Sequence, residues 1–226
     1  MSAREDILNR LAGRLDIMAT EKCPDGISRQ NIAAAKVKGY LDNPQKWPRP
    51  IKLAEDCANQ EKMLQLFCKN ALNLQSTVER LSSLDKLPAA AAAYCQRYDL
   101  PKTVTFWPEY SQLPWPAHGF SQEKTNSQSG VTGVFCAIAE TGSLLLCSST
   151  STPATTSLLP ETHFAVVKVD RIVLSLEEAW QLVRSELGQL PRNVKLISGP
   201  SRTADIEQTM VIGAHGPYRV HVFLVE

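Results

Sequence analysis

The side chains best suited to chemistry lie in one short stretch, residues 197–207, which reads Ile-Ser-Gly-Pro-Ser-Arg-Thr-Ala-Asp-Ile-Glu. Residues 194–197 are typical of a short buried strand, and Gly199 with the proline after it ends that strand. Ser201, Arg202, Asp205 and Glu207 then supply a hydroxyl, a guanidinium and two carboxylates. Because ligands in open α/β sheets dock outside the carboxyl ends of strands, we expect this loop to hold a small polar molecule.

A second candidate is the turn Glu-Thr-Gly at residues 140–142, which lies between expected strands at 134–139 and 143–147. Glu140, Thr141 and Gly142 offer a carboxylate, a hydroxyl and flexible backbone, which suit a ligand hydroxyl or an anion held by bare amides. The alternative is an ordinary hairpin turn, in which Gly142 supplies a positive φ angle and Glu140 faces water. The pattern by itself favours the hairpin turn.

A loop bracketed by glycines, residues 213–218, places His215 and then Arg219 at the start of an expected final strand. His215 suits an acid, a base or a ligand clamp, and it equally suits a hydrogen-bonded turn. His118 belongs to a proline-containing stretch, residues 108–129, that we expect to be a long surface loop. An exposed loop histidine explains His118 better than a site does.

The composition of the whole chain excludes several classes of protein. Of its 226 residues 43% are hydrophobic and 21% charged, and 24 basic against 23 acidic side chains leave a formal net charge of +1. This predicts a globular chain, and without a basic block nucleic acid is not an expected partner. The start of the sequence has no secretory pattern, and no apolar run approaches the roughly 20 residues that cross a bilayer. We therefore expect a cytoplasmic protein without a transmembrane segment.

The six cysteines are scattered, and no two of them form a Cys-x-x-Cys clip. This spacing argues against an iron–sulfur cluster or a zinc ion held by the chain itself. We interpret the cysteines as reduced, mostly buried thiols, and we expect no metal site in this chain.

The elements that must position these residues begin with a separate segment. Ser2 and Glu5 form a capping box before a first helix, residues 31–41 favour a second, and prolines between residues 44 and 50 make a stiff link. We therefore divide the chain into an N-terminal helical extension, residues 1–50, and an α/β domain, residues 51–226. In the domain, the order helix 53–71, strand 77–81, helix 84–98, strand 103–107 predicts a parallel crossover unit.

The C-terminal half carries further strand signals, at residues 164–169, 171–173 and 219–225. Ser175 and Glu178 form a second capping box, for a helix that runs to Leu187 and ends at Gly188. The alternation within residues 219–225 predicts a strand with one face buried and the other partly exposed.

Several of these motifs occur together, in this order, in a known family. Residues 130–133 (Gly-Val-Thr-Gly), 137–142 (Ala-Ile-Ala-Glu-Thr-Gly), 158–163 (Leu-Leu-Pro-Glu-Thr-His), 198–207 and 213–217 (Gly-Ala-His-Gly-Pro) resemble the lactate-utilisation protein C family, whose domain is called LUD. The match is dense from residue 130 to residue 226 and looser before it.

The resemblance implies a three-layer α/β/α sandwich, similar to the group of ribose-5-phosphate isomerase (RpiA), glucosamine-phosphate deaminase (NagB) and CoA transferase, with an N-terminal helical extension. It also implies work beside iron–sulfur partner proteins in oxidising L-lactate to pyruvate. No cofactor is expected in this chain. The clusters are expected on the partner subunits, where a flavin is a further candidate.

Lactate carries a carboxylate and a hydroxyl, so a competent pocket needs a guanidinium clamp and a proton acceptor. Arg202 and Arg219 are the candidate clamps, and His215, Asp205 and Glu207 are the candidate catalytic bases. Equally, Arg202 with Asp205 or Glu207 could form an ion-pair network that fixes the loop. The remaining residues of the expected substrate-binding set are Thr132, Glu140, Thr141, Gly142, Gly199, Ser201 and Gly216.

Three functions stay open on these grounds. The first is a subunit of a lactate-oxidising oxidoreductase complex, whether or not this chain is itself catalytic. The second is an independent enzyme for a small acid, a sugar phosphate or an acyl-CoA thioester, by analogy with fold relatives. The third is a non-catalytic scaffold or ligand-binding subunit. A nicotinamide-dependent dehydrogenase is disfavoured, because no Gly-x-Gly-x-x-Gly fingerprint follows a strand.

Overall fold

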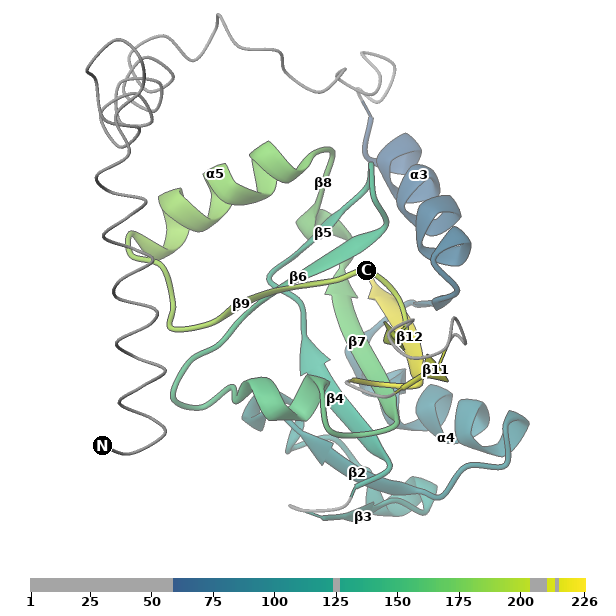
Figure 1. Ribbon diagram of the computed structural model, residues 1–226. Coiled ribbons are helices and arrows are strands. Elements are labelled where there is room, and N and C mark those ends of the chain that lie inside the picture. Colours follow the sequence, from purple (N-terminus) through teal and green to yellow (C-terminus); the bar gives the residue numbers. More distant parts are fainter. Residues whose placement is uncertain (1–58, 124–126, 204–210, 214–215) are drawn as a thin grey trace, which may run out of the picture. The chain divides into compact units, whose positions relative to one another are not determined.

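The computed structural model describes residues 59–123, 127–203, 211–213 and 216–226 (Figure 1). The chain divides into two compact units, Met1–Leu53 and Ala54–Glu226, and the described residues all belong to the second. The helices expected before residue 50 lie outside the described residues, so the predicted helical extension stays a prediction. In the described part of the chain, no helix is long and apolar enough to cross a membrane.

A parallel sheet of six strands forms the centre of the described unit. Every neighbouring pair in it is parallel, and so the strands all present their carboxyl ends at one edge (Figure 1). The α/β class expected from the sequence is therefore confirmed. In spatial order the strands are β1 (Thr77–Leu81), β12 (Arg219–Val225), β7 (Thr162–Lys168), β4 (Ser129–Gly133), β2 (Thr103–Phe106) and β3 (Ser121–Gln122).

A second sheet of four strands was not expected from the sequence. Its β5–β6 and β6–β9 pairs are antiparallel, and its β5–β8 pair is parallel. A short antiparallel pair, β10 (Arg202–Thr203) with β11 (Val211–Ile212), follows it in the chain. The four strands, in spatial order, are β8 (Ile172–Val173), β5 (Cys136–Ile138), β6 (Ser143–Cys147) and β9 (Val194–Ile197).

In the part of the chain that the structure describes, the α-helices beside these sheets are α3 (Gln60–Asn73), α4 (Leu87–Arg97) and α5 (Leu176–Leu187). Helix α4, formed by the alanine run, covers one face of the parallel sheet, where the Tyr94 ring meets Phe164 edge-on at 5.4 Å. Helix α5 packs on the second sheet through Ala179 and Val183. It begins at Ser175, whose side chain accepts a hydrogen bond from the Glu178 amide, and ends at Gly188 as predicted. Short 3-10 turns join the elements: η2 (Leu84–Lys86), η3 (Pro108–Tyr110), η4 (Pro116–His118), η5 (Ala154–Ser157) and η6 (Val169–Arg171).

Two local predictions are wrong for the same reason, the depth of burial. Strand β12 has both faces buried, because side chains from other elements pack on each face of the parallel sheet, whereas one face was expected to be partly exposed. The stretch at 108–129 is not a simple surface loop, since Tyr110, Trp115 and Phe120 in it are buried. The Trp115 ring stacks on Phe106 of β2 at 5.7 Å and thereby anchors the stretch to the sheet.

Candidate functional site

The loop that the sequence singled out does follow a strand, but that strand is β9 of the second sheet. The carboxyl end of β9 leads to the edge where the parallel strands begin, because the loop after it contacts Leu74, just before β1. There Gly199, with φ +85°, lies so close to the Leu74 carbonyl that a side chain would overlap it. Arg202 Nη2 donates to the same carbonyl at 3.5 Å. Leu74 precedes β1, so the loop packs at the amino edge of the parallel sheet.

The second predicted loop joins the first at this edge. The Ser201 amide donates to the Pro217 carbonyl at 3.0 Å, and the Gly213 amide donates to the Ser201 carbonyl at 2.9 Å. A Cβ on Gly216 would lie 3.2 Å from Ser201 Cβ. We call the surface formed by Gly199, Ser201, Arg202, Gly216 and Arg219 the amino rim. The candidate bases His215, Asp205 and Glu207 lie outside the described residues, so their roles stay predictions.

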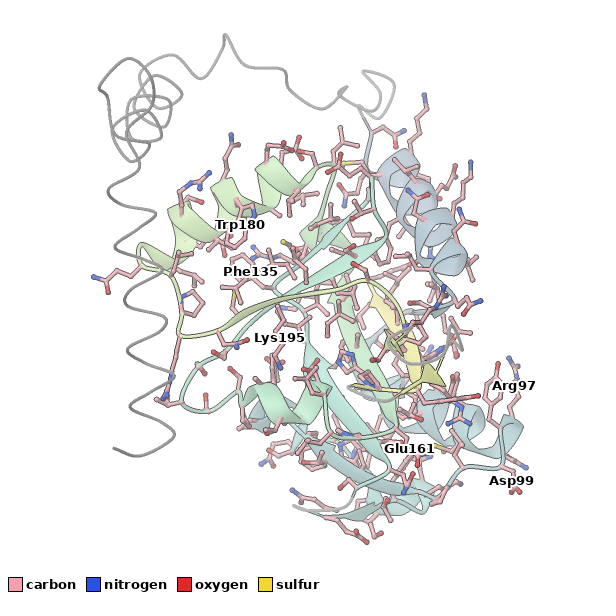
Figure 2. All side chains as sticks on the ribbon, in the orientation of Figure 1. Arg97, Asp99, Phe135, Glu161, Trp180 and Lys195 are labelled. Atoms are coloured by element: carbon pink, nitrogen blue, oxygen red, sulfur yellow. The ribbon has the colours of Figure 1, made fainter. Side chains whose placement is uncertain are left out.

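Two guanidinium groups give the amino rim its charge. Arg219, at the start of β12, lies over the Tyr218 ring at 4.7 Å, and its Nη1 is 4.0 Å from a Glu161 carboxylate oxygen. Glu161 stands directly before β7, as Figure 2 shows. Within the described residues, this Nη1 atom is buried and has no hydrogen-bond partner. Arg202 is exposed. Spare guanidinium donors of this kind suit bidentate capture of a carboxylate.

The turn at residues 140–142 connects two helices instead of projecting into solvent. The Asn70 side chain of α3 donates to the Glu140 carbonyl at 3.0 Å, and Gly142, with φ +69°, packs against the backbone of Asn70 and its neighbour. Glu140 Oε1 accepts a hydrogen bond from the Leu176 amide at 2.8 Å, at the first turn of α5. The Glu140 carboxylate is therefore engaged with the start of a helix, while Thr141 is exposed. A hydroxyl contact of 2.7 Å between Ser143 and Ser198 links this turn to the loop of the amino rim.

Thr132 lies inside the protein, between the two sheets, with a partner that the site prediction missed. Its hydroxyl is 2.8 Å from Nε2 of His163, and both residues are fully buried. Burial, aided by the positive charge of Lys195, lowers the pKa of His163 to about 3, so the ring is neutral. Among the described residues its Nδ1 has no hydrogen-bond partner. A histidine directly before the apolar run 164–167 was the signal that could have identified it.

Lys195, on β9 of the second sheet, makes further polar contacts (Figure 2). Its ammonium donates to the Ala154 carbonyl at 2.6 Å and to the Ser157 hydroxyl at 3.5 Å. Burial lowers the pKa of Lys195. Lys195 therefore ties β9 of the second sheet to η5, and its positive charge lies near the Thr132–His163 pair of the parallel sheet.

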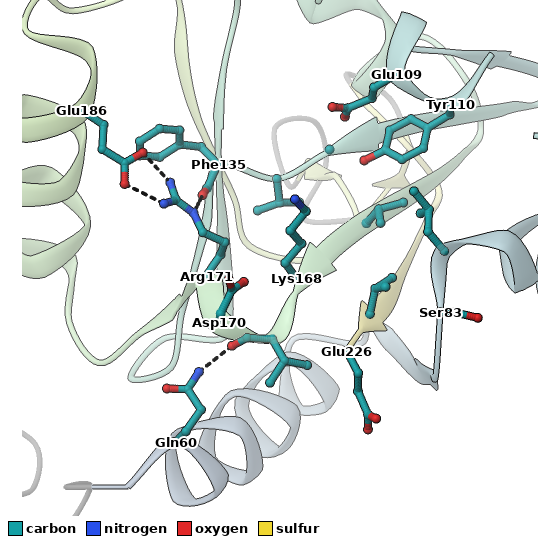
Figure 3. Close-up of a pocket in the computed structure, with 16 residues that line it drawn as sticks. Gln60, Ser83, Glu109, Tyr110, Phe135, Lys168, Asp170, Arg171, Glu186 and Glu226 are labelled. Carbon is teal, nitrogen blue, oxygen red and sulfur yellow. Dashed lines mark hydrogen bonds and ion pairs between the residues drawn. The ribbon is translucent and has the colours of Figure 1, made fainter. Parts of the chain in front are cut away.

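A large cleft lies at the opposite edge of the parallel sheet, where ligands of open α/β sheets are usually found (Figure 3). Its volume is about 1240 Å³. Residues at or just beyond the carboxyl ends of β1, β2, β4, β7 and β12 line it. We call it the carboxyl cleft. Its polar and charged lining residues are Gln60, Ser83, Glu109, Tyr110, Lys168, Asp170, Arg171, Glu186 and Glu226.

One wall of the carboxyl cleft is built around Gly133, the last residue of β4. A Cβ there would overlap a Glu109 carboxylate oxygen and would lie 3.0 Å from the Tyr110 hydroxyl. Burial, the negative charge of Glu109 and a hydrogen bond to it raise the pKa of Tyr110. The phenol therefore stays protonated and donates to the carboxylate. Gly133 is needed at this strand end because it leaves room for both groups.

The facing wall carries an arginine clamp. Arg171 Nη1 and Nη2 donate to the two Glu186 carboxylate oxygens at 2.6 and 2.9 Å, and its Nε donates to the Phe135 carbonyl at 2.9 Å. The guanidinium also lies 4.8 Å from the centre of the Phe135 ring. Arg171 is thus saturated by its neighbours, and it offers a ligand few free donors.

Lys168 extends into the carboxyl cleft from the end of β7 (Figure 3). No ion pair or hydrogen bond joins its ammonium to another of the described residues. Glu109, Asp170 and Glu226 are exposed around the cleft, and Arg80, which is not part of the lining, lies 3.6 Å from Glu226. Carboxylates thus outnumber cations in the lining.

The four described cysteines, Cys68, Cys95, Cys136 and Cys147, are free thiols. Burial raises the pKa of each, to about 12 for Cys136, so they are poor nucleophiles and poor metal ligands at neutral pH. Across the residues that the structure describes, no three histidine, cysteine, aspartate or glutamate side chains come together to hold a metal ion. These residues therefore do not fit an iron–sulfur cluster.

Comparison with known proteins relates the chain to one family. The model of the LUD domain matches residues 73–225. An uncharacterized protein of Neisseria meningitidis is 43% identical over 93 residues, which are 41% of this chain and 40% of the relative. Lactate utilization protein C 1 of Bacillus mycoides is 38% identical over 100 residues, 43% of each chain. Lactate utilization protein C of Bacillus subtilis is 35% identical over 99 residues, 42% of this chain and 41% of the relative. The chain thus aligns with less than half the length of these curated relatives.

A solved structure shares the fold. The crystal structure of a DUF162 family protein from Deinococcus radiodurans superposes with a TM-score of 0.54, at 22% sequence identity. The superposition covers 74% of this chain and 99% of that one. It supports the arrangement of the sheets and helices described above.

Proposed function

Because the chain belongs to the LUD domain family, we propose that it acts in lactate utilisation, as one component of an iron–sulfur-containing assembly that oxidises L-lactate to pyruvate. The observation that carries the proposal is the match of residues 73–225 to that domain, together with relatives that bear the name lactate utilization protein C. The clusters, and a flavin if the assembly holds one, are proposed to reside on partner subunits.

The amino rim is the proposed place for the small carboxylate. Arg202 and Arg219 bring guanidinium donors to one surface, and a carboxylate is the acceptor that such donors bind best. Ser201 and the backbone near Gly199 and Gly216 lie on the same surface and suit a ligand hydroxyl. The candidate bases for the lactate hydroxyl are His215, Asp205 and Glu207, on the same two loops of the sequence.

The oxidation also needs an electron acceptor outside this chain. Converting lactate to pyruvate removes two electrons and two protons, and protein side chains supply no acceptor for the electrons. In the proposal, this chain binds and orients the acid and accepts a proton. The two electrons and the second proton pass to a redox group on a partner subunit.

The proposal is tested by purifying the tagged chain from cells grown on lactate and identifying the proteins that accompany it, with their iron and flavin content. We expect iron–sulfur proteins to co-purify, and we expect deletion of the gene to abolish growth on lactate but not on glucose. Normal growth of the deletion strain on lactate, or purification of the chain without an iron–sulfur protein, would contradict the proposed function.

A further inference from the structure

We propose that the carboxyl cleft is a docking site for a basic, partly apolar segment of a partner subunit, and that it is not the pocket for the small acid. This inference rests on the proposed function, because it takes the partner to be the iron–sulfur protein of the same assembly. Three properties of the cleft carry it: its size, its charge and the composition of its walls.

The size of the cleft does not fit a small acid. Its volume of about 1240 Å³ exceeds the roughly 300–1,000 Å³ of typical small-molecule pockets, and those pockets enclose ligands far larger than lactate. A molecule as small as lactate would leave most of its own surface in water here. A peptide segment that places several side chains in the cleft would fill it.

The charge of the cleft disfavours an anion. Arg171 and Glu186 neutralise one another through two hydrogen bonds, and Glu226 is close to Arg80. The groups left over are the Glu109 and Asp170 carboxylates and the Lys168 ammonium. Like charges across an interface cost binding energy and complementary charges steer association, so an incoming Lys or Arg side chain is favoured over a carboxylate or a phosphate.

The walls between these charges are apolar. Leu84, Val134, Val166, Val169 and Val225 come from five different segments and line the cleft together with the Phe135 ring. Buried apolar surface at the centre with charged groups around it is the usual composition of a protein–protein interface. The occupant is therefore expected to carry apolar side chains between its basic ones.

The amino rim is separated from this surface by the length of the sheet. Strand β12 begins at Arg219, on the amino rim, and ends at Val225, which lines the carboxyl cleft. Seven residues of extended chain span about 20 Å. A partner seated at the cleft would therefore leave the proposed acid site uncovered, so the two roles do not compete for space.

The test measures binding of the purified iron–sulfur protein that accompanies the chain, once identified, to full-length variants at low and at physiological ionic strength. Asp170→Lys with Glu226→Lys reverses two exposed charges and should weaken binding about tenfold, mainly through slower association. Lys168→Glu should do the opposite and raise the association rate. Glu123→Lys, an exposed carboxylate outside the cleft, is the matched control and should bind as the wild type does.

The sign of these effects decides the outcome. If Lys168→Glu weakens binding and Asp170→Lys with Glu226→Lys strengthens it, the occupant is acidic and the inference is wrong. If the partner co-purifies but every variant binds it equally, the docking surface lies elsewhere, while the proposed function stands. If no iron–sulfur protein accompanies the chain, both proposals fall. Circular dichroism and thermal melting of each variant confirm that the reversed charges leave the fold intact.

Discussion

The two edges of the parallel sheet differ in almost every property that marks a site. The amino rim is rich in motifs, carries guanidinium groups and has tight glycine contacts such as that of Gly199 with Leu74. The carboxyl cleft has no recognisable motif, carries more carboxylates than cations and is large. The difference shows that motif density and cavity size report different things. In the proposals above, the motifs of the amino rim are assigned to a small acid and the large cleft to a bulky partner.

The largest effect is expected at Gly142, where a positive φ angle and a close backbone contact occur together. Gly142→Ala adds a methyl group to a residue with φ +69° and drives it into the backbone of α3. The left-handed conformation and the overlap together should cost about 3–4 kcal/mol, measured by urea unfolding. Gly188→Ala is the control, because Gly188 has φ +66° but has no heavy atom within 4 Å of the added carbon. It should cost only about 1 kcal/mol, and equal losses in the two variants would contradict the close approach.

The next prediction tests whether the small acid binds at the amino rim and not in the carboxyl cleft. Arg202→Ala should weaken lactate or pyruvate binding by about 1.5–3 kcal/mol, which is the range for a hydrogen bond to a charged group. Binding is measured by calorimetry, and growth on lactate is measured in parallel. Because Arg202 is exposed and makes one weak described contact, the melting temperature should stay unchanged. The matched variant at the other edge, Lys168→Ala, should leave acid binding intact. If Arg202→Ala binds the acid normally, the residue does not belong to a site.

The pH dependence of folding stability should come mainly from two buried histidines near the amino ends of β7 and β12. Burial, as the first cause, lowers the pKa of both His163 and His221 to about 3, and neither residue lines the carboxyl cleft. In the unfolded chain each histidine takes up a proton near pH 6.5, whereas in the folded chain it stays neutral down to about pH 3. Folding stability is therefore complete above pH 6.5 and falls as the pH drops from 6.5 toward 3.

For each histidine the free energy of unfolding should fall by about 1.4 kcal/mol per pH unit inside this window. Urea unfolding at several pH values measures the slope. His163→Gln should remove the contribution of His163 to this slope. An unchanged slope in that variant would show that burial does not hold the ring neutral.

The sequence predicted several helix and strand boundaries, because these depend on local signals. The capping box at Ser175, the end of that helix at Gly188 and the last strand, Arg219–Val225, are all found where they were predicted. The resemblance to the LUD family is confirmed by the match of residues 73–225. These features depend on neighbours a few residues apart, and a single sequence contains that information.

The rest could not be predicted, because it depends on how strands pair across the chain. The short run 194–197 gives no sign that it joins an antiparallel second sheet, so the expected docking edge for its loop was placed by a rule for parallel strands. The strand expected at 134–139 is the shorter β5, and the buried β4 at Ser129–Gly133 was not among the expected strands. Glu109 and Tyr110 follow β2 and Lys168 ends β7, and only the completed sheet brings these two strand ends to one cleft.

The smallest effect is expected at the wall of the carboxyl cleft. Glu186→Gln replaces a charged acceptor of Arg171 with a neutral one and should lower the stability only slightly, because both side chains are partly exposed to screening solvent. High salt should shrink the difference between variant and wild type, as measured by urea unfolding. The two hydrogen bonds also fix the Arg171 guanidinium against Phe135, so the variant should change partner docking more than it changes stability. The amino rim lies at the other end of the strands, and acid binding there should be unaffected. A loss of acid binding in Glu186→Gln would show that the two edges act as one site.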